Sequence, residues 1–189
     1  QILRFLTLII FFMTKFYKSL LTLLLALCTT VANAYDFKVD NIYYNITDAE
    51  NKTVEVTKGA DSRYNYYGDV VIPDYVTYEG TTYKVIRIGE MAFCYDKYME
   101  SITIGKEIRC VSTYAFSSSC ENLTKVVLPN DNKNIIKARA FYNNKALEEV
   151  ENLQFVKAIG EYAFASSGIK SATIGENVIC DEGAFYLSS

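Results

Sequence analysis

Glu149 and Glu151 are the two carboxylates in this sequence whose spacing best suits acid–base chemistry. On a β-strand their side chains would point to one face, about 6.5 to 7 Å apart. This overlaps the separation of the two carboxyl groups in inverting glycoside hydrolases. Such catalysis also needs an apolar pocket that raises the pKa of one carboxyl group, and the neighbouring residues supply none. We therefore predict a solvated acidic face and a chain that is not an enzyme.

Other catalytic and metal-binding groups are scarce. The chain contains no His, the commonest general base and metal ligand. The polar run 131–134 has the residue types of a calcium loop but lacks the Gly and Glu that would follow, so we interpret it as a turn. The sequence contains no C-x-x-C pair, and we predict no zinc site, no cofactor and no disulfide. The cysteines concerned are Cys94, Cys110, Cys120 and Cys180.

A sequence repeat predicts the strands and turns that position these residues. An Ala-Phe pair occurs five times, and its Phe residues are separated by 23, 25, 23 and 21 positions. A regular spacing of this kind is typical of solenoids and propellers. The Phe residues are Phe93, Phe116, Phe141, Phe164 and Phe185.

Other positions keep phase with the Phe residues. Each unit approximates I-G-x-x-A-F, then a variable polar link, L-x-x-V-x-I and a Gly or Pro turn. The V-x-I segment alternates with period two, which predicts a strand with one buried face. The I-G-x-x-A-F segment predicts a short strand or one helical turn with close backbone approach. Such a unit cannot bury its own apolar face, so neighbouring units must stack. Where Asn152 replaces an apolar strand residue, we expect Leu153 to compensate through a bulge.

This pattern resembles that of the BspA-like leucine-rich repeat family of secreted and surface bacterial proteins, over about residues 69–189. The resemblance implies a β-rich α/β repeat fold. This is a right-handed leucine-rich-repeat solenoid with a parallel strand ladder, short helical turns and an N-terminal antiparallel β cap. It also implies that a Cys or small polar residue, three positions before the Leu of the L-x-x-V-x-I segment, forms hydrogen bonds with backbone groups of the turn. Cys120, Asn144 and Ser166 occupy that position.

The chain is predicted to have four parts. Residues 1–12 are an upstream extension, and residues 13–34 a secretory signal with Lys15 and Lys18, an apolar run and a small-x-small cleavage site. A membrane anchor is the alternative, but the apolar run is too short to span. Residues 35–84 form the β-rich cap, with hairpins at 42–56 and 74–84 and a first ladder strand at 69–73. Residues 85–189 hold about four and a half repeats, which we expect to be C-terminally truncated.

The charge of the exported chain argues against nucleic acid. Removal of Arg4, Lys15 and Lys18 lowers Lys plus Arg from 19 to 16, while Asp plus Glu stay at 22, so the net charge becomes 16 − 22 = −6. An acidic surface repels phosphate backbones, and no basic stripe offsets it. We therefore expect no nucleic-acid partner and no stable membrane span after signal cleavage.

The outward strand residues are the candidate binding site. A stacked array presents them as an extended face, which solenoids use to bind macromolecules. We predict a secreted or cell-surface protein that binds extracellular proteins or glycans, with adhesion as the role that the resemblance implies. The alternatives are an envelope scaffold whose repeats space another module, and a glycan-processing accessory. The candidate residues are Ser101, Thr103, Lys125, Val127, Glu149, Glu151, Ser171 and Thr173.

Overall fold

The computed structural model describes residues 13–15, 17, 34–59, 66–117 and 121–188. Contacts divide the chain into residues 1–33 and 34–189. In the first unit, residues 13–15 and 17 are helical. The upstream extension, nearly all of the predicted export signal and Cys120 lie outside the described residues. Across the described ranges, no helix combines the length and apolar character that a membrane span requires.

The second unit begins with three antiparallel strands. These are β1 (Phe37–Val39), β2 (Ile42–Asp48) and β3 (Thr53–Thr57). Tyr44 pairs with Val56 and Ile46 with Val54, which confirms the hairpin predicted from the alternating apolar residues. The second predicted hairpin is also present, because β5 (Tyr75–Tyr78) pairs antiparallel with the start of β6 (Thr81–Ile88) around Gly80.

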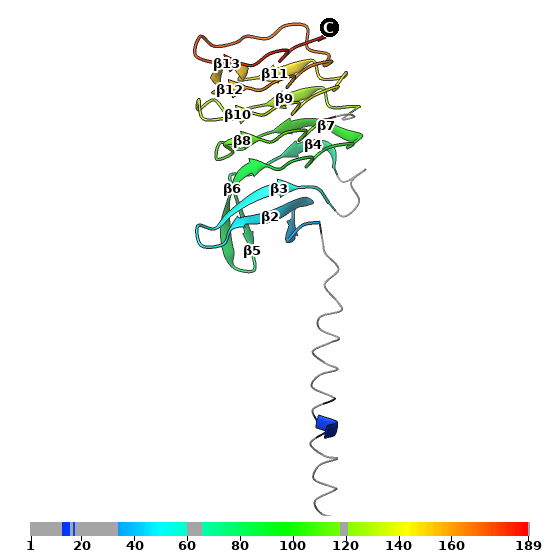
Figure 1. The fold of residues 1–189 in the computed structure, drawn as a ribbon, viewed down its shortest axis with the longest axis vertical. Helices are drawn as coiled ribbons and strands as arrows, with labels where there is room; N and C mark the ends of the chain where they lie inside the picture. The colour runs from blue at the N-terminus through cyan, green and yellow to red at the C-terminus, as the bar shows by residue number, and fades with distance from the viewer. Residues whose placement is uncertain (1–12, 16, 18–33, 60–65, 118–120, 189) are drawn as a thin grey trace, which may run out of the picture. The chain divides into compact units, whose positions relative to one another are not determined.

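Two parallel ladders then run through the repeats (Figure 1). Sheet A continues from β3 through β6 and four two-residue strands, whose apolar residues align in the predicted phase. The strands are β8 (Cys110–Val111), β10 (Ile135–Ile136), β12 (Ala158–Ile159) and β13 (Ile179–Cys180), and the aligned residues are Ile88, Val111, Ile136, Ile159 and Cys180.

Sheet B is the ladder of V-x-I segments. Asp69 pairs with Ser101 and Ser101 with Lys125, so the first ladder strand lies where the sequence predicted it. The strands are β4 (Tyr67–Val71), β7 (Tyr98–Thr103), β9 (Lys125–Val127) and β11 (Glu149–Glu151), in the order β11-β9-β7-β4.

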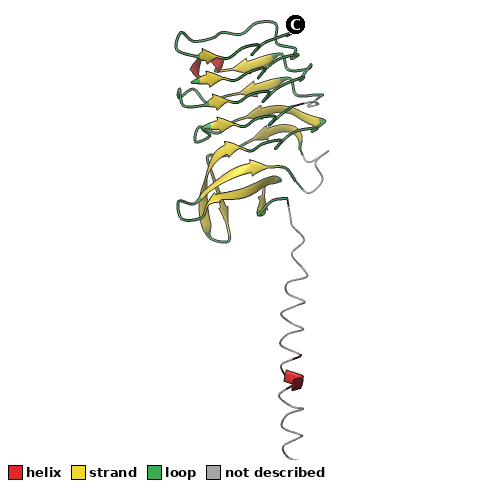
Figure 2. Cartoon of the chain, viewed as in Figure 1, coloured by secondary structure: helices red, strands yellow, loops and turns green. Residues whose placement is uncertain are grey.

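In the described residues the two sheets are connected by tight turns and, between β11 and β12, by one short 3₁₀ helix (Figure 2). The expected helical turn after Ile88 is instead a series of tight turns, in which Ala92 N–H donates to the Gly89 carbonyl and Cys94 N–H to the Met91 carbonyl. A positive φ two residues before each Phe interrupts any helix, because a right-handed helix needs negative φ throughout. The residues with this conformation are Met91, Tyr114, Arg139, Tyr162 and Gly183.

A 3₁₀ turn replaces the expected bulge at Asn152. Asn152 has φ 65° and precedes the 3₁₀ helix η1 (Leu153–Phe155). Leu153 is buried, so it compensates as predicted, although by a different backbone route. The Asn152 amide donates to the Leu128 carbonyl of the preceding repeat at 2.8 Å.

The Ala-Phe pairs form the centre of the core. Each of the first four Phe N–H groups donates to the Ala carbonyl of the next repeat, as Phe116 does to Ala140 at 2.8 Å. Gly89 permits the close approach that the sequence indicated, since a Cβ there would lie 2.7 Å from the Val56 carbonyl oxygen. The stacking of units therefore provides both hydrogen bonds and buried apolar area.

Candidate functional site

The outer face of sheet B aligns most of the predicted binding residues. Lys125 pairs with Ser101 on one side and Glu149 on the other, while Val127 pairs with Thr103 and Glu151. Successive residues of a strand point to opposite faces, and the intervening Val126 is fully buried. Six of the eight candidates are thus arranged in two outward columns across β7, β9 and β11.

Lys125 organises the charge on this face. Its ammonium group forms ion pairs with Glu149, at 3.2 Å, and with Glu151. The hydrogen bond to Glu151, followed by that to Glu149, raises the pKa of Lys125. Toward β4, the Ser101 hydroxyl donates to Asp69 at 2.6 Å. The face therefore has mixed charge: Glu149 and Glu151 contact the Lys125 ammonium group, and Asp69 accepts from Ser101.

Ser171 and Thr173 lie beyond the last strand of sheet B. Residues 171–173 have no strand conformation and are exposed. They nevertheless line a hollow of about 400 Å³ together with Glu149 and Glu151. The structure thus brings these two candidates close to the acidic end of the face, although not as a continuation of the ladder.

The paired carboxylates have the geometry of a surface ion-pair network. The side chains of Glu149 and Glu151 are 57% and 42% exposed, and both contact the Lys125 ammonium group. Asp131, from the polar run considered as a calcium loop, contacts Arg109 and Lys133. Among the described residues, no three His, Cys, Asp or Glu side chains are grouped as a metal site would require.

The described cysteines are free thiols. Cys94 is buried, its Sγ donates to the Ser117 carbonyl at 3.1 Å, and burial raises its pKa. Cys110 and Cys180 are partly buried and exposed, respectively. Asn144 plays the polar turn role that the family resemblance implied, since its buried amide donates to the Phe116 carbonyl at 2.8 Å.

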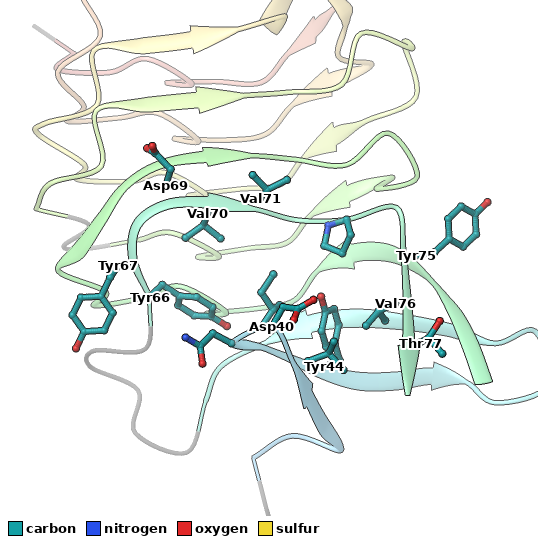
Figure 3. A pocket seen from close by; sticks show the side chains of 14 residues that line it. Asp40, Tyr44, Tyr66, Tyr67, Asp69, Val70, Val71, Tyr75, Val76 and Thr77 are labelled. Atoms are coloured by element: carbon teal, nitrogen blue, oxygen red, sulfur yellow. The ribbon is translucent and has the colours of Figure 1, made fainter. Parts of the chain in front are cut away.

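The sequence did not identify a second candidate region beside β4. The rings of Tyr67 and Tyr98 stack with their centroids 5.1 Å apart and are 64% and 44% exposed. Next to them lies a groove of about 590 Å³ between β4 and the turn that joins β1 to β2 (Figure 3). The abundance of Tyr in the N-terminal part was the available signal, but the pairing of distant segments was not apparent from it.

Comparison with known proteins identifies the repeats. The model of a BspA type leucine rich repeat region matches residues 75–189 in six copies. A leucine-rich repeat protein from Bacteroides ovatus ATCC 8483 is 34% identical, with a TM-score of 0.68, over 80% of this chain and 38% of its own. A leucine rich cell surface protein from Faecalibacterium prausnitzii A2-165 is 27% identical, with a TM-score of 0.63, over 80% and 40%.

A third solved structure supports the fold alone. It is a leucine-rich repeat protein from Bacteroides capillosus ATCC 29799, 24% identical with a TM-score of 0.55, and the match covers 77% of this chain and 97% of that one. The chain spans about two fifths of the length of the first two relatives. No curated protein matches it.

Proposed function

Because the chain belongs to the BspA-type leucine-rich repeat family, we propose that it is a non-catalytic bacterial binding protein. It holds extracellular protein or glycan ligands on the outer face of sheet B and serves in adhesion to host or microbial surfaces. The observation that carries this proposal is the in-register alignment of outward residues on β7, β9 and β11. Aligned strands hold these side chains at fixed separations, so a ligand meets a face that is already ordered.

An exported location accords with this role. The Faecalibacterium prausnitzii relative is described as a cell surface protein. In our proposal residues 13–34 direct export and are removed. Residues 35–84 then act as the N-terminal cap of a right-handed solenoid, because β1 to β3 continue sheet A ahead of the first repeat. Such a cap protects a sheet edge that would otherwise pair with other chains.

Charge reversal on the face tests the binding role. We would first screen the purified chain against immobilised extracellular-matrix proteins and a glycan array, and then titrate the strongest ligand by biolayer interferometry. The double variant Glu149→Lys, Glu151→Lys should weaken capture of that ligand at least several-fold, because the partners of the Lys125 ammonium group become cations. The side chains concerned are exposed to solvent, which screens both the lost ion pairs and the new repulsion, so the fold should persist.

A control variant separates the face from overall charge. Glu161→Lys with Glu182→Lys changes the net charge equally, at exposed turn positions outside sheet B. This control should capture the ligand as the parent chain does. Equal capture by all three proteins would exclude the acidic end of sheet B as the binding surface. Equal loss in both double variants would instead assign capture to net charge.

A further inference from the structure

The edge strand β4 offers a second, independent place for a ligand. Sheet B has the order β11-β9-β7-β4, so β4 pairs with β7 and, within the described residues, with no strand on its other side. An open strand edge presents backbone donors and acceptors to any extended segment of suitable length. The groove lies along this open side of β4.

The backbone of β4 faces the groove with usable hydrogen-bonding groups. Ile72 N–H donates to the Thr103 carbonyl of β7 at 2.9 Å. Because successive N–H groups along a strand point to opposite sides, the N–H of Val71 points away from β7. Pro73 has no N–H, so this edge can pair with a short segment only.

The groove has the shape of a binding site for a chain segment. Its volume of about 590 Å³ is within the range of ligand pockets. Buried Val70, Val76 and Tyr44 form part of its lining. Figure 3 shows Tyr67 and Tyr75 at its opposite ends, and their rings are 64% and 50% exposed. An extended segment between these rings would pack its side chains on apolar surface and on aromatic rings.

The charge of the groove selects among such segments. Asp40 from the β1–β2 turn and Asp69 from β4 line it, and among the described residues no Lys or Arg does. Asp40 lies in the middle of the groove in Figure 3. A segment that carries Lys or Arg is therefore complementary, whereas an acidic segment would be repelled.

We propose that the groove beside β4 binds an extended, basic peptide segment of a separate partner protein by β-strand addition. Main-chain hydrogen bonds to the edge of β4 supply affinity, and Asp40 and Asp69 supply the preference for a cationic side chain. This site shares Asp69 with the outer face of sheet B, but its occupation does not depend on Glu149 or Glu151.

Synthetic peptides test the proposal directly. The probes are capped Lys-Val-Thr-Val-Thr-Lys, its Glu-for-Lys counterpart, a copy N-methylated at both valines, and neutral maltotetraose. Each is titrated to millimolar concentration into the isotope-labelled chain, with amide chemical shifts as readout. The Lys peptide should shift the amides of β4 and the β1–β2 turn. The Glu peptide and the N-methylated peptide should bind far more weakly, because they lack the charge and the main-chain donors, respectively.

Variants locate the interaction. Asp40→Asn and Asp69→Asn should each weaken the Lys peptide about two- to fivefold. Asn tolerates the φ of 47° at residue 40, so the turn is kept. Glu161→Gln, outside the groove, is the matched control and should change nothing. Val71→Pro removes the outward N–H and should abolish peptide binding, with folding checked by urea titration.

Several results would overturn the proposal. Absence of shifts with the Lys peptide would do so, as would equal binding of the Glu or N-methylated peptide. Shifts around Tyr67 and Tyr75 with maltotetraose alone would make the groove a saccharide site. Concentration-dependent shifts of β4 without any peptide would assign the edge to a second copy of the chain. Since Glu149→Lys with Glu151→Lys should leave peptide binding unchanged, failure here is distinguishable from failure of the ladder-face proposal.

Discussion

The ring of Phe116 stacks on the ring of Phe141 with centroids 4.7 Å apart and planes 6° from parallel. The same relation continues in both directions, to Phe93 at 4.8 Å and to Phe164 at 5.0 Å, and from there to Phe185 at 5.3 Å. One ring per repeat therefore forms a continuous aromatic column, and each interior ring is stabilised by a neighbour on both sides.

Removal of an interior ring should be costly. Phe141 is fully buried between two rings, so Phe141→Ala should lower the free energy of unfolding by about 3 to 5 kcal/mol through lost burial and the cavity left behind. Urea unfolding followed by circular dichroism measures the change.

The end of the column provides the control. Phe185 is partly buried, and Phe164 is its only ring neighbour in the described part of the chain. Phe185→Ala should therefore cost about 1 to 2 kcal/mol. Equal costs at the two positions would contradict the larger contribution expected from full burial and stacking on both sides.

The sequence predicted the buried Phe positions and the ladder of V-x-I strands, because buried positions recur at a nearly regular spacing. It did not predict the turn conformation. At Met91, Tyr114 and Arg139 the φ angle is positive, yet none of these residues is the Gly or Asn that normally signals such a position. The conformation is imposed by stacking on the next repeat, as the Arg139 N–H bond to the Glu161 carbonyl illustrates. The conformational preferences of the individual residues therefore did not indicate these positive φ angles.

At a positive φ angle, Gly should stabilise the fold more than Ala does. Met91 allows a test of this expectation. Met91 is 44% exposed with φ 55°, so its side chain contributes little while its backbone is strained. Met91→Gly should be about 1 kcal/mol more stable than Met91→Ala, the opposite of the order in helices and strands. Thermal and urea unfolding of the two variants provide the comparison, and a more stable Ala variant would contradict the imposed conformation.

Asn144 and Asn134 form a matched pair for the polar turn role. Both are buried, and the Oδ1 of each has no partner. Asn144 donates to the backbone carbonyl of Phe116, whereas Asn134 donates to the Asp131 carboxylate. Asn144→Leu should cost about 1 to 3 kcal/mol, because the Phe116 carbonyl is left without this donor.

Asn134→Leu should behave differently. The Asp131 carboxylate keeps its contacts with Arg109 and Lys133, and an unpaired buried oxygen is removed. The variant should therefore be neutral or up to about 1 kcal/mol more stable. Differential scanning calorimetry measures the stability of both variants. A larger loss of stability for Asn134→Leu than for Asn144→Leu would refute the turn role assigned to Asn144.

The two candidate sites differ in how far the sequence could reveal them. Ser101, Lys125 and Glu149 were predicted as neighbours because a repeat converts sequence phase directly into spatial pairing. The groove joins Asp40 to Asp69 across segments with no common period. Its position depends on how the N-terminal strands pack beside the first repeat, which a pattern of alternating residues does not specify.

Tyr44, which lines the groove, should make stability depend on alkaline pH. Burial, and secondarily the Asp40 carboxylate, raise the pKa of Tyr44 above its ordinary value of 10.0. Above that value the unfolded chain releases the proton while the folded chain retains it. The unfolded state then binds fewer protons, so the free energy of unfolding falls as pH rises, by at most about 1.4 kcal/mol per pH unit for this group.

Tyr44→Phe should show a shallower fall of the unfolding free energy in urea titrations above pH about 10, and no change in slope below it. Tyr142→Phe, at a 36% exposed position, should retain the parental slope. A parental slope in the Tyr44 variant as well would mean that other groups cause the alkaline instability.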